Sequence, residues 1–127
     1  MQLLILVVDD EPDVEALFRQ HFRRDLRDGR FAMEFAQSAP AALQCISDAG
    51  TASLILILSD INMPGMSGLE LLEHIKHKYL KPPPVVMMIT AYGDAENYNI
   101  AKQLGADDFL TKPVDFTLLK EKLKTIH

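Results

Sequence analysis

The sequence is poor in the features that mark several large classes of protein. Its 127 residues contain one cysteine, Cys45, so a scaffold stapled by internal disulfides is excluded. No apolar run approaches the ~18 residues that a membrane-spanning helix needs. The opening MQLLILVV has no basic leader, and two aspartates follow it at once, which is not the pattern of a signal peptide. We therefore expect a soluble, cytoplasmic protein in which Cys45 is a small core residue.

Positive charge is also scarce. Lysine and arginine number 13 against 18 acidic residues, and the formal net charge is −5. This balance disfavours a general binder of nucleic acid or of membrane surfaces. One basic cluster stands out, and because Asp25 and Asp28 interrupt it, we interpret it as a solvated helix end; its members are Arg19, Arg23, Arg24, Arg27 and Arg30.

Short apolar runs indicate buried strands. Three of them are continuous, as in parallel strands covered on both faces, and a fourth is very short. The segment Phe31–Ala36 instead alternates apolar and polar residues, which favours an edge strand. The four runs are Leu3–Val8, Leu54–Leu58, Val85–Ile89 and Phe109–Leu110.

Helical patterns lie between and after these runs. Ser67 and Glu70 have the spacing of a capping box, Gly105 is a stop signal, and Asp115 is a cap for the last helix. The apolar stripe of Ala95–Leu104 is thin. The other stripes are Val14, Leu17, Phe18 and Phe22; Ala39, Ala42, Leu43 and Ile46; Leu69, Leu72 and Ile75; and Phe116, Leu119, Leu123 and Ile126.

Strand and helix alternate five times along the chain. This order predicts an α/β fold, a doubly wound sandwich with a five-stranded parallel sheet. The strand order 2-1-3-4-5 places the alternating segment at one edge and the short last strand at the other. No linker or repeat interrupts the pattern, so we expect one domain over residues 1–127.

Chemically active side chains follow four of the five predicted strands. Asp9, Asp10 and Glu11 follow the first strand, and Asp60 follows the third. Thr90 ends the fourth strand and Lys112 follows the fifth. Ligands of open parallel sheets bind at the carboxyl ends of the strands, at the topological switch point. An aspartate after one strand is often only a turn residue, but four strand ends with compatible groups indicate a site.

The charges of this group predict its chemistry. Two carboxylates ~4 Å apart repel by ~4 kcal/mol at an effective dielectric constant of ~20. A hard divalent cation relieves this repulsion, and oxygen ligands suit Mg²⁺. A carboxylate is also a nucleophile that can form an aspartyl-phosphate. A cation and the ammonium of Lys112 would neutralise an incoming phosphoryl group, to which Thr90 could donate.

Four motifs of this sequence resemble the receiver domain of two-component response regulators. They are VVDDEP, SDINMPGMSG, MITAYG and GADDFLTKP. The resemblance covers essentially the whole chain. It implies a CheY-like receiver with a flavodoxin-like (βα)5 fold.

The resemblance also implies roles for single residues. Asp60 is similar to the phosphoacceptor, which takes a phosphoryl group from a histidine kinase or a phosphotransfer protein. Asp9 and Asp10 resemble the acidic pair for Mg²⁺, with Asp10 the more direct ligand and Asp9 acting through water. Asp60 itself and the backbone carbonyl of Asn62 would complete the metal site.

Further positions match the switch of that family. Thr90 resembles the switch hydroxyl, Lys112 the ammonium that contacts the phosphoryl group, and Phe109 the switch aromatic, although a core aromatic fits Phe109 equally well. The resemblance implies a cis bond between Lys112 and Pro113. It also implies that Asn62 and Tyr92 tune the lifetime of the phosphate.

The same resemblance implies a signalling domain rather than an enzyme, with self-catalysed phosphotransfer and autodephosphorylation. Phosphorylation would move Thr90 and Phe109 and so change the surface of the 95–104 helix, the last strand and the last helix. The output domain or protein is unknown, and we expect no direct binding to nucleic acid or membrane.

Two other functions fit parts of the sequence. One is a Mg²⁺-dependent phosphohydrolase that works through an aspartyl-phosphate. Haloacid dehalogenase-type enzymes, however, have one residue between their two aspartates. Asp9 and Asp10 have none between them. The other is a receiver-like docking module that is never phosphorylated. The sequence disfavours this function, because the acceptor, the acidic pair, the threonine and the lysine are all present.

Overall fold

A computed structural model of the chain describes residues 3–49, 54–63, 65–78, 84–91 and 93–124. Its centre is a five-stranded sheet in which every neighbouring pair of strands is parallel. The strand order β2-β1-β3-β4-β5 confirms the predicted topology. The strands are β1 (Leu3–Val8), β2 (Phe31–Ala36), β3 (Leu54–Asp60), β4 (Val85–Thr90) and β5 (Asp108–Thr111).

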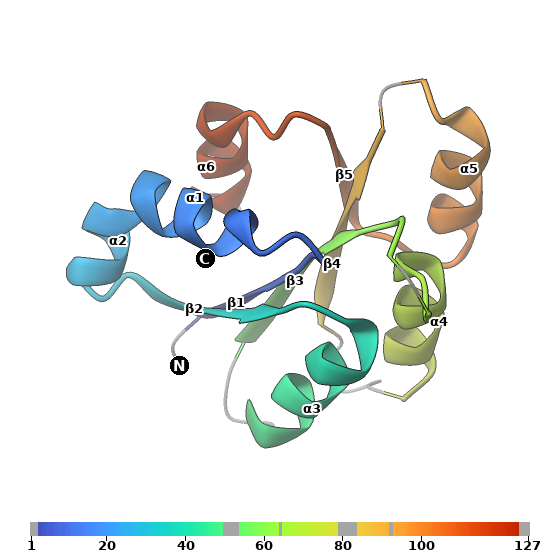
Figure 1. Cartoon of the computed structure of the whole chain (residues 1–127), viewed down its shortest axis with the longest axis horizontal. Helices are drawn as coiled ribbons and strands as arrows, with labels where there is room; N and C mark the ends of the chain where they lie inside the picture. The colour runs from blue at the N-terminus through green and yellow to red at the C-terminus, as the bar shows by residue number, and fades with distance from the viewer. Residues whose placement is uncertain (1–2, 50–53, 64, 79–83, 92, 125–127) are drawn as a thin grey trace.

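Helices cover both faces of the sheet (Figure 1). One face carries α1 (Asp13–His21), α2 (Arg23–Arg27) and α6 (Phe116–Lys124). The opposite face carries α3 (Ala39–Ala49), α4 (Gly68–Lys78) and α5 (Ala95–Gln103). The doubly wound α/β sandwich expected from the sequence is therefore confirmed.

Neighbouring residues of one strand belong to two separate hydrophobic cores. In β1, Ile5 and Val7 pack in one core with Phe18 of α1 and with Phe22, which separates α1 from α2. Leu6 and Val8 pack in the other core with α3 and α4. This division follows from the strand geometry, in which successive side chains point to opposite faces. Central strands buried on both faces explain why their sequences are continuous apolar runs.

The first predicted helix is divided in two. Helix α1 ends at His21, and Phe22 leaves the helical region with φ −109° and ψ 15° before the short α2 begins. The ring of Phe22 is fully buried and lies against Phe18 and Phe31, with centroids 6.2 and 5.8 Å apart. Leu17, expected on the buried stripe, is 46% exposed, because the inward positions of α1 are spaced by four residues.

The predicted helix boundaries have hydrogen-bonded caps. The Ser67 hydroxyl accepts a hydrogen bond from the Glu70 amide at 3.2 Å. The Asp115 carboxylate accepts from the amides of Thr117 and Leu118 at 3.0 and 3.1 Å. Gly105 has a φ of +100°, a conformation that ends α5 and that glycine adopts without strain.

Cys45 does not have the burial that the sequence predicted. It is partly exposed on α3 and packs at the margin of the core. Within the described residues, no helix has the length and apolar character to cross a membrane. Pro64, Tyr92, Ile126 and the chain-end residue His127 lie outside the described residues.

Candidate functional site

The side chains predicted to form a site lie where four strands end. Strands β1, β3, β4 and β5 are consecutive neighbours and all parallel, so their carboxyl ends meet at one edge of the sheet. In register, Val8 pairs with Ser59 and Thr90 pairs with Thr111. The residues that follow these pairs, Asp9, Asp60 and Lys112, are thereby brought together.

Three carboxylates form a cluster at this edge. One carboxylate oxygen from each of Asp9, Asp10 and Asp60 lies within 4.8 Å of the other two. Asp60 is 3% exposed and Asp9 is 9% exposed, whereas Asp10 is half-buried. Closely spaced and partly desolvated carboxylates repel one another, and a cation placed among them relieves that repulsion.

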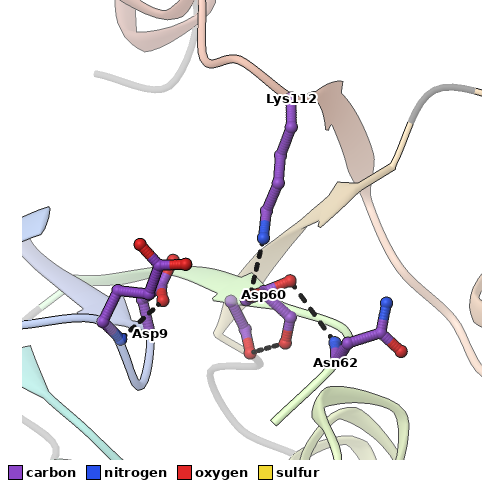
Figure 2. A network of polar contacts seen from close by, with 6 residues as sticks. Asp9, Asp60, Asn62 and Lys112 are labelled. Carbon is purple, nitrogen blue, oxygen red and sulfur yellow. Dashed lines mark hydrogen bonds and ion pairs between the residues drawn. The ribbon is translucent and has the colours of Figure 1, made fainter.

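Asp60 is held by one donor on each oxygen (Figure 2). The ammonium of Lys112 donates to Oδ2 at 2.8 Å, and the backbone amide of Asn62 donates to Oδ1 at 3.3 Å. The lysine descends from the end of β5 and the amide belongs to the loop after β3. These two contacts orient the Asp60 carboxylate at the carboxyl ends of the strands.

Asp9 is fixed by backbone contacts on both sides. Its amide donates to the Ala36 carbonyl at 3.0 Å, and its Oδ1 accepts from the Glu11 amide at 3.0 Å. Burial raises the pKa of Asp9, and the neighbouring charge of Asp60 raises it further. The Glu11 hydrogen bond and the charge of Lys112 oppose these effects without cancelling them. The net pKa of Asp9 is therefore raised, with burial as its main cause.

Lys112 supplies the positive charge of the site. Burial alone would lower the pKa of its ammonium, but the hydrogen bond and the charge of Asp60 outweigh burial, and the net pKa is raised. The charges of Asp9 and Glu11 act in the same direction. The Lys112 amide also donates to the Thr90 carbonyl at 2.9 Å, which ties the lysine to the end of β4. Lys112 is thus held in its cationic form above Asp60.

The peptide bond between Lys112 and Pro113 is cis, as the family resemblance implied. Thr90 lies at the carboxyl end of β4 and is 4% exposed, one residue beyond Ile89, the residue paired with Asp60. Phe109 is half-buried in β5, and its ring centroid lies 4.3 Å from that of Tyr98 on α5. The switch roles of Thr90 and Phe109 stay predictions, as does the metal-binding role of the Asn62 carbonyl.

One residue at the site was missed by sequence reasoning. A side chain on Gly68 would place its Cβ 2.0 Å from the carbonyl oxygen of Asp60 and 2.8 Å from Cα of Ile61. The Gly68 amide donates to the Ile61 carbonyl at 2.8 Å, which draws the start of α4 onto the end of β3. The sequence signal for this role is weak. It is a glycine at the first position of a predicted helix, although glycine has a low helix propensity.

Ser59 is a polar residue inside a buried strand, directly before Asp60. It is 1% exposed, and its hydroxyl donates to the Asp60 carbonyl at 3.0 Å. This hydrogen bond satisfies the buried hydroxyl. The backbone carbonyl of Asp60 therefore accepts from the Ser59 hydroxyl, while the Asp60 carboxylate accepts from Lys112.

Several known proteins are similar to this chain in sequence. The family model of the response regulator receiver domain matches residues 5–124. The response regulator protein PilR of Pseudomonas aeruginosa is 37% identical over 120 residues, which cover 94% of this chain. A protein named as a probable cyclic di-GMP phosphodiesterase of Vibrio cholerae is 34% identical over 124 residues, or 98% of this chain. The chain spans 25% and 26% of the length of these two relatives.

The fold agrees with the sequence comparison. The crystal structure of a response regulator receiver protein from Pseudomonas putida matches with a TM-score of 0.80 and 27% sequence identity, and the match covers 98% of both chains. The family model and the relatives span nearly the whole chain, including all four strand ends that carry the site. The chain belongs to the family of response regulator receiver domains.

Proposed function

We propose that residues 1–127 form one receiver domain in which Asp60 accepts a phosphoryl group from the phosphohistidine of a histidine kinase or a phosphotransfer protein. One observation carries this proposal. Asp60 is the only member of the described acidic cluster whose carboxylate is bonded to Lys112, at 2.8 Å, and it lies beside Asp9 and Asp10. A nucleophilic carboxylate with cationic support on one side and metal ligands on the other suits phosphoryl transfer.

The transfer proceeds by attack of an Asp60 oxygen on phosphorus. The new O–P bond forms as the bond from phosphorus to the donor's ring nitrogen breaks, and the imidazole leaves with the electron pair and takes up a proton. Lys112 neutralises charge on the phosphoryl oxygens, and the Asn62 amide keeps the carboxylate oriented. Because transfer depends mainly on positioning and charge, the fixed geometry of Asp60 is what the protein contributes.

The donor set fits Mg²⁺. Asp9, Asp10 and Asp60 supply hard oxygen ligands, and the Asn62 carbonyl is the proposed fourth. Three carboxylates share a single ammonium, that of Lys112, among the described contacts of the cluster, and a divalent cation would supply the further positive charge. When bound, the metal ion supplies positive charge to the transferring phosphoryl group.

The proposed output is a change at the surface formed by α5, β5 and α6. Thr90 would turn toward the phosphoryl group and Phe109 would follow it inward. Ala101 is the only fully buried residue of α5 among those described, and Tyr98 and Ile100 on the same helix are exposed. A helix held by so little buried surface shifts at low cost in free energy.

The domain is proposed as a signalling module without nucleic-acid or membrane contacts of its own, acting in the cytoplasm on an output that the chain does not identify. The alternative is a Mg²⁺-dependent phosphohydrolase that turns over small phosphoesters through the same aspartyl-phosphate. The two functions differ in outcome: a receiver retains one phosphoryl group and hydrolyses it itself, whereas a hydrolase releases many phosphates from a substrate.

Acetyl phosphate with Mg²⁺ tests the proposal. We expect intact-mass measurement to show one added phosphoryl group in the wild type and none in Asp60→Asn. Asp13→Asn, an exposed aspartate on α1, is the matched control and should react like the wild type. Phosphorylation that persists in Asp60→Asn contradicts the proposed acceptor, and steady turnover of a chromogenic phosphoester favours the hydrolase.

A further inference from the structure

A basic groove lies at the opposite end of the molecule from the carboxylate cluster. It is an open hollow of about 490 Å³ between α1, α2 and α6. Helix α1 starts at the carboxyl edge of the sheet and runs back along it, so α2 lies beside the start of β2 (Figure 1). The residues that line the groove are Gln20, His21, Arg23, Arg24, Asp25, Arg27, Arg30 and Lys120.

The groove carries a large excess of positive charge. Five of its lining residues are cationic and one, Asp25, is acidic. The Asp25 carboxylate is already paired with Arg30 at 3.1 Å. Among the described residues, neither Arg23 nor Arg24 lies in an ion pair. The solvated helix end expected from the sequence is therefore also a concave site with uncompensated charge.

Neighbouring contacts hold parts of the groove in place. The His21 ring is stacked on Phe116 of α6, with centroids 3.9 Å apart and planes 5° from parallel. The Lys120 ammonium lies 5.4 Å from the centre of the Phe22 ring, which is itself fully buried. These aromatic contacts hold α6 against the end of α1, although the two helices are far apart in the sequence. They therefore fix the spacing of the groove walls.

We propose that this groove binds the oligophosphate chain of a small molecule such as a nucleoside triphosphate. Guanidinium groups form paired hydrogen bonds with phosphate oxygens, and the two unpaired arginines have that capacity free. The volume falls in the range of small-ligand pockets, about 300–1,000 Å³. Duplex nucleic acid or an anionic membrane would extend past the groove onto a chain with a net charge of −5, whereas a short polyanion would not.

Calorimetric titration of the intact chain at physiological ionic strength tests this site. Tripolyphosphate and ATP are the probes, and Mg²⁺ is left out so that it does not mask their charge. We expect saturable binding of one molecule per chain, weakened at least about tenfold in Arg23→Gln/Arg24→Gln, because hydrogen bonds to charged groups are lost. Circular dichroism checks that the variant is folded, and the single variant Arg24→Gln replaces it if it is not.

Two control variants separate this site from other charges. Arg19→Gln removes an arginine that lies outside the groove and pairs with Glu15 at 2.9 Å, and it should bind as the wild type does. Asp60→Asn should also bind unchanged, since the carboxylate cluster lies at the other edge of the sheet. Equal affinity for the two probes assigns recognition to the phosphate chain, and tighter binding of ATP assigns it to a nucleotide.

Three results would overturn the proposal. The first is the absence of saturable binding of both probes. The second is equal binding by the wild type and the groove variants. The third is a preference for phosphatidylserine vesicles or a DNA duplex over ATP, in parallel assays at the same ionic strength.

Discussion

Asp60 depends on donors that come from different segments of the chain. Lys112 reaches it from beyond β5, and the Asn62 amide reaches it from the loop that follows β3. The sequence was enough to predict that these side chains meet, because parallel strands bring their carboxyl ends to one edge of the sheet. The individual hydrogen bonds depend on loop geometry, which residue patterns do not specify.

Gly68 is the residue whose replacement should be most informative. In Gly68→Ala the new Cβ would meet the Asp60 carbonyl at 2.0 Å, so backbone must move. We expect a loss of about 1–3 kcal/mol in the free energy of unfolding, measured by urea denaturation, together with slower phosphorylation by acetyl phosphate. Glu73→Ala, exposed on the same helix, should change stability by less than about 0.5 kcal/mol. Equal stability of Gly68→Ala and the wild type would show that this close approach is not required.

The carboxylate cluster should make stability depend on divalent cation. Adding Mg²⁺ to the metal-free protein should raise the free energy of unfolding, by about 1.4 kcal/mol at a free concentration ten times the Kd. The gain should vanish in Asp9→Asn/Asp10→Asn, because two of the three clustered carboxylates are removed. Urea denaturation with and without Mg²⁺ measures both effects. Calcium is a second probe, and an identical gain in the double variant would place cation binding elsewhere.

At the scale of elements, tertiary contacts decide what the sequence pattern leaves open. The pattern predicted the five strands and most caps, since burial on two faces and cap residues are local signals. It did not predict the break at Phe22, which buries its ring against Phe18 and Phe31. Nor did it predict the link in which the Lys76 ammonium contacts Asp107 at 2.8 Å and the Pro84 carbonyl at 3.2 Å. Such links join residues far apart in the sequence.

A second link joins β5 to α6 and should respond to pH. Burial alone would raise the pKa of Asp108, but the hydrogen bonds from Lys122 and from the Phe109 amide outweigh it, and the net pKa is lowered. An acid whose pKa is lower in the folded state stabilises the fold above its unfolded pKa and loses that contribution as the pH falls. Asp108→Asn should therefore be less stable than the wild type at neutral pH, and the difference should shrink as the medium is acidified below about pH 4.

The size of that effect is limited by solvent. The two side chains are 38% and 25% exposed, so we expect a difference of less than about 1 kcal/mol, measured by urea denaturation across the pH range. Glu121→Gln is the matched control because its contact with Lys124, at 3.5 Å, is far more exposed. A pH-independent difference for Asp108→Asn would mean that its carboxylate acts by packing and not by charge.

At the scale of the whole molecule, the two ends of the parallel strands carry opposite charge. Carboxylates cluster where the strands end, and the cations of the basic groove lie at the opposite end. Helix α1 connects the two, with acidic residues in its first turn and basic residues in its last. This arrangement also matches the helix dipole, which favours negative charge at the N-terminus and positive charge at the C-terminus.

Asp9, Asp60, Thr90 and Lys112 belong to four separate strand ends, spread over most of the chain. The ribosome makes them in that order, so the chain grows by 52 residues between the proposed acceptor and its lysine partner. The β5 strand must then join the sheet beside β4 before the lysine can reach Asp60. A nascent chain released before β5 would carry the proposed acceptor and the acidic pair without the ammonium. Under the proposed function, phosphorylation of Asp60 therefore requires that translation has passed β5 and that β5 has joined the sheet.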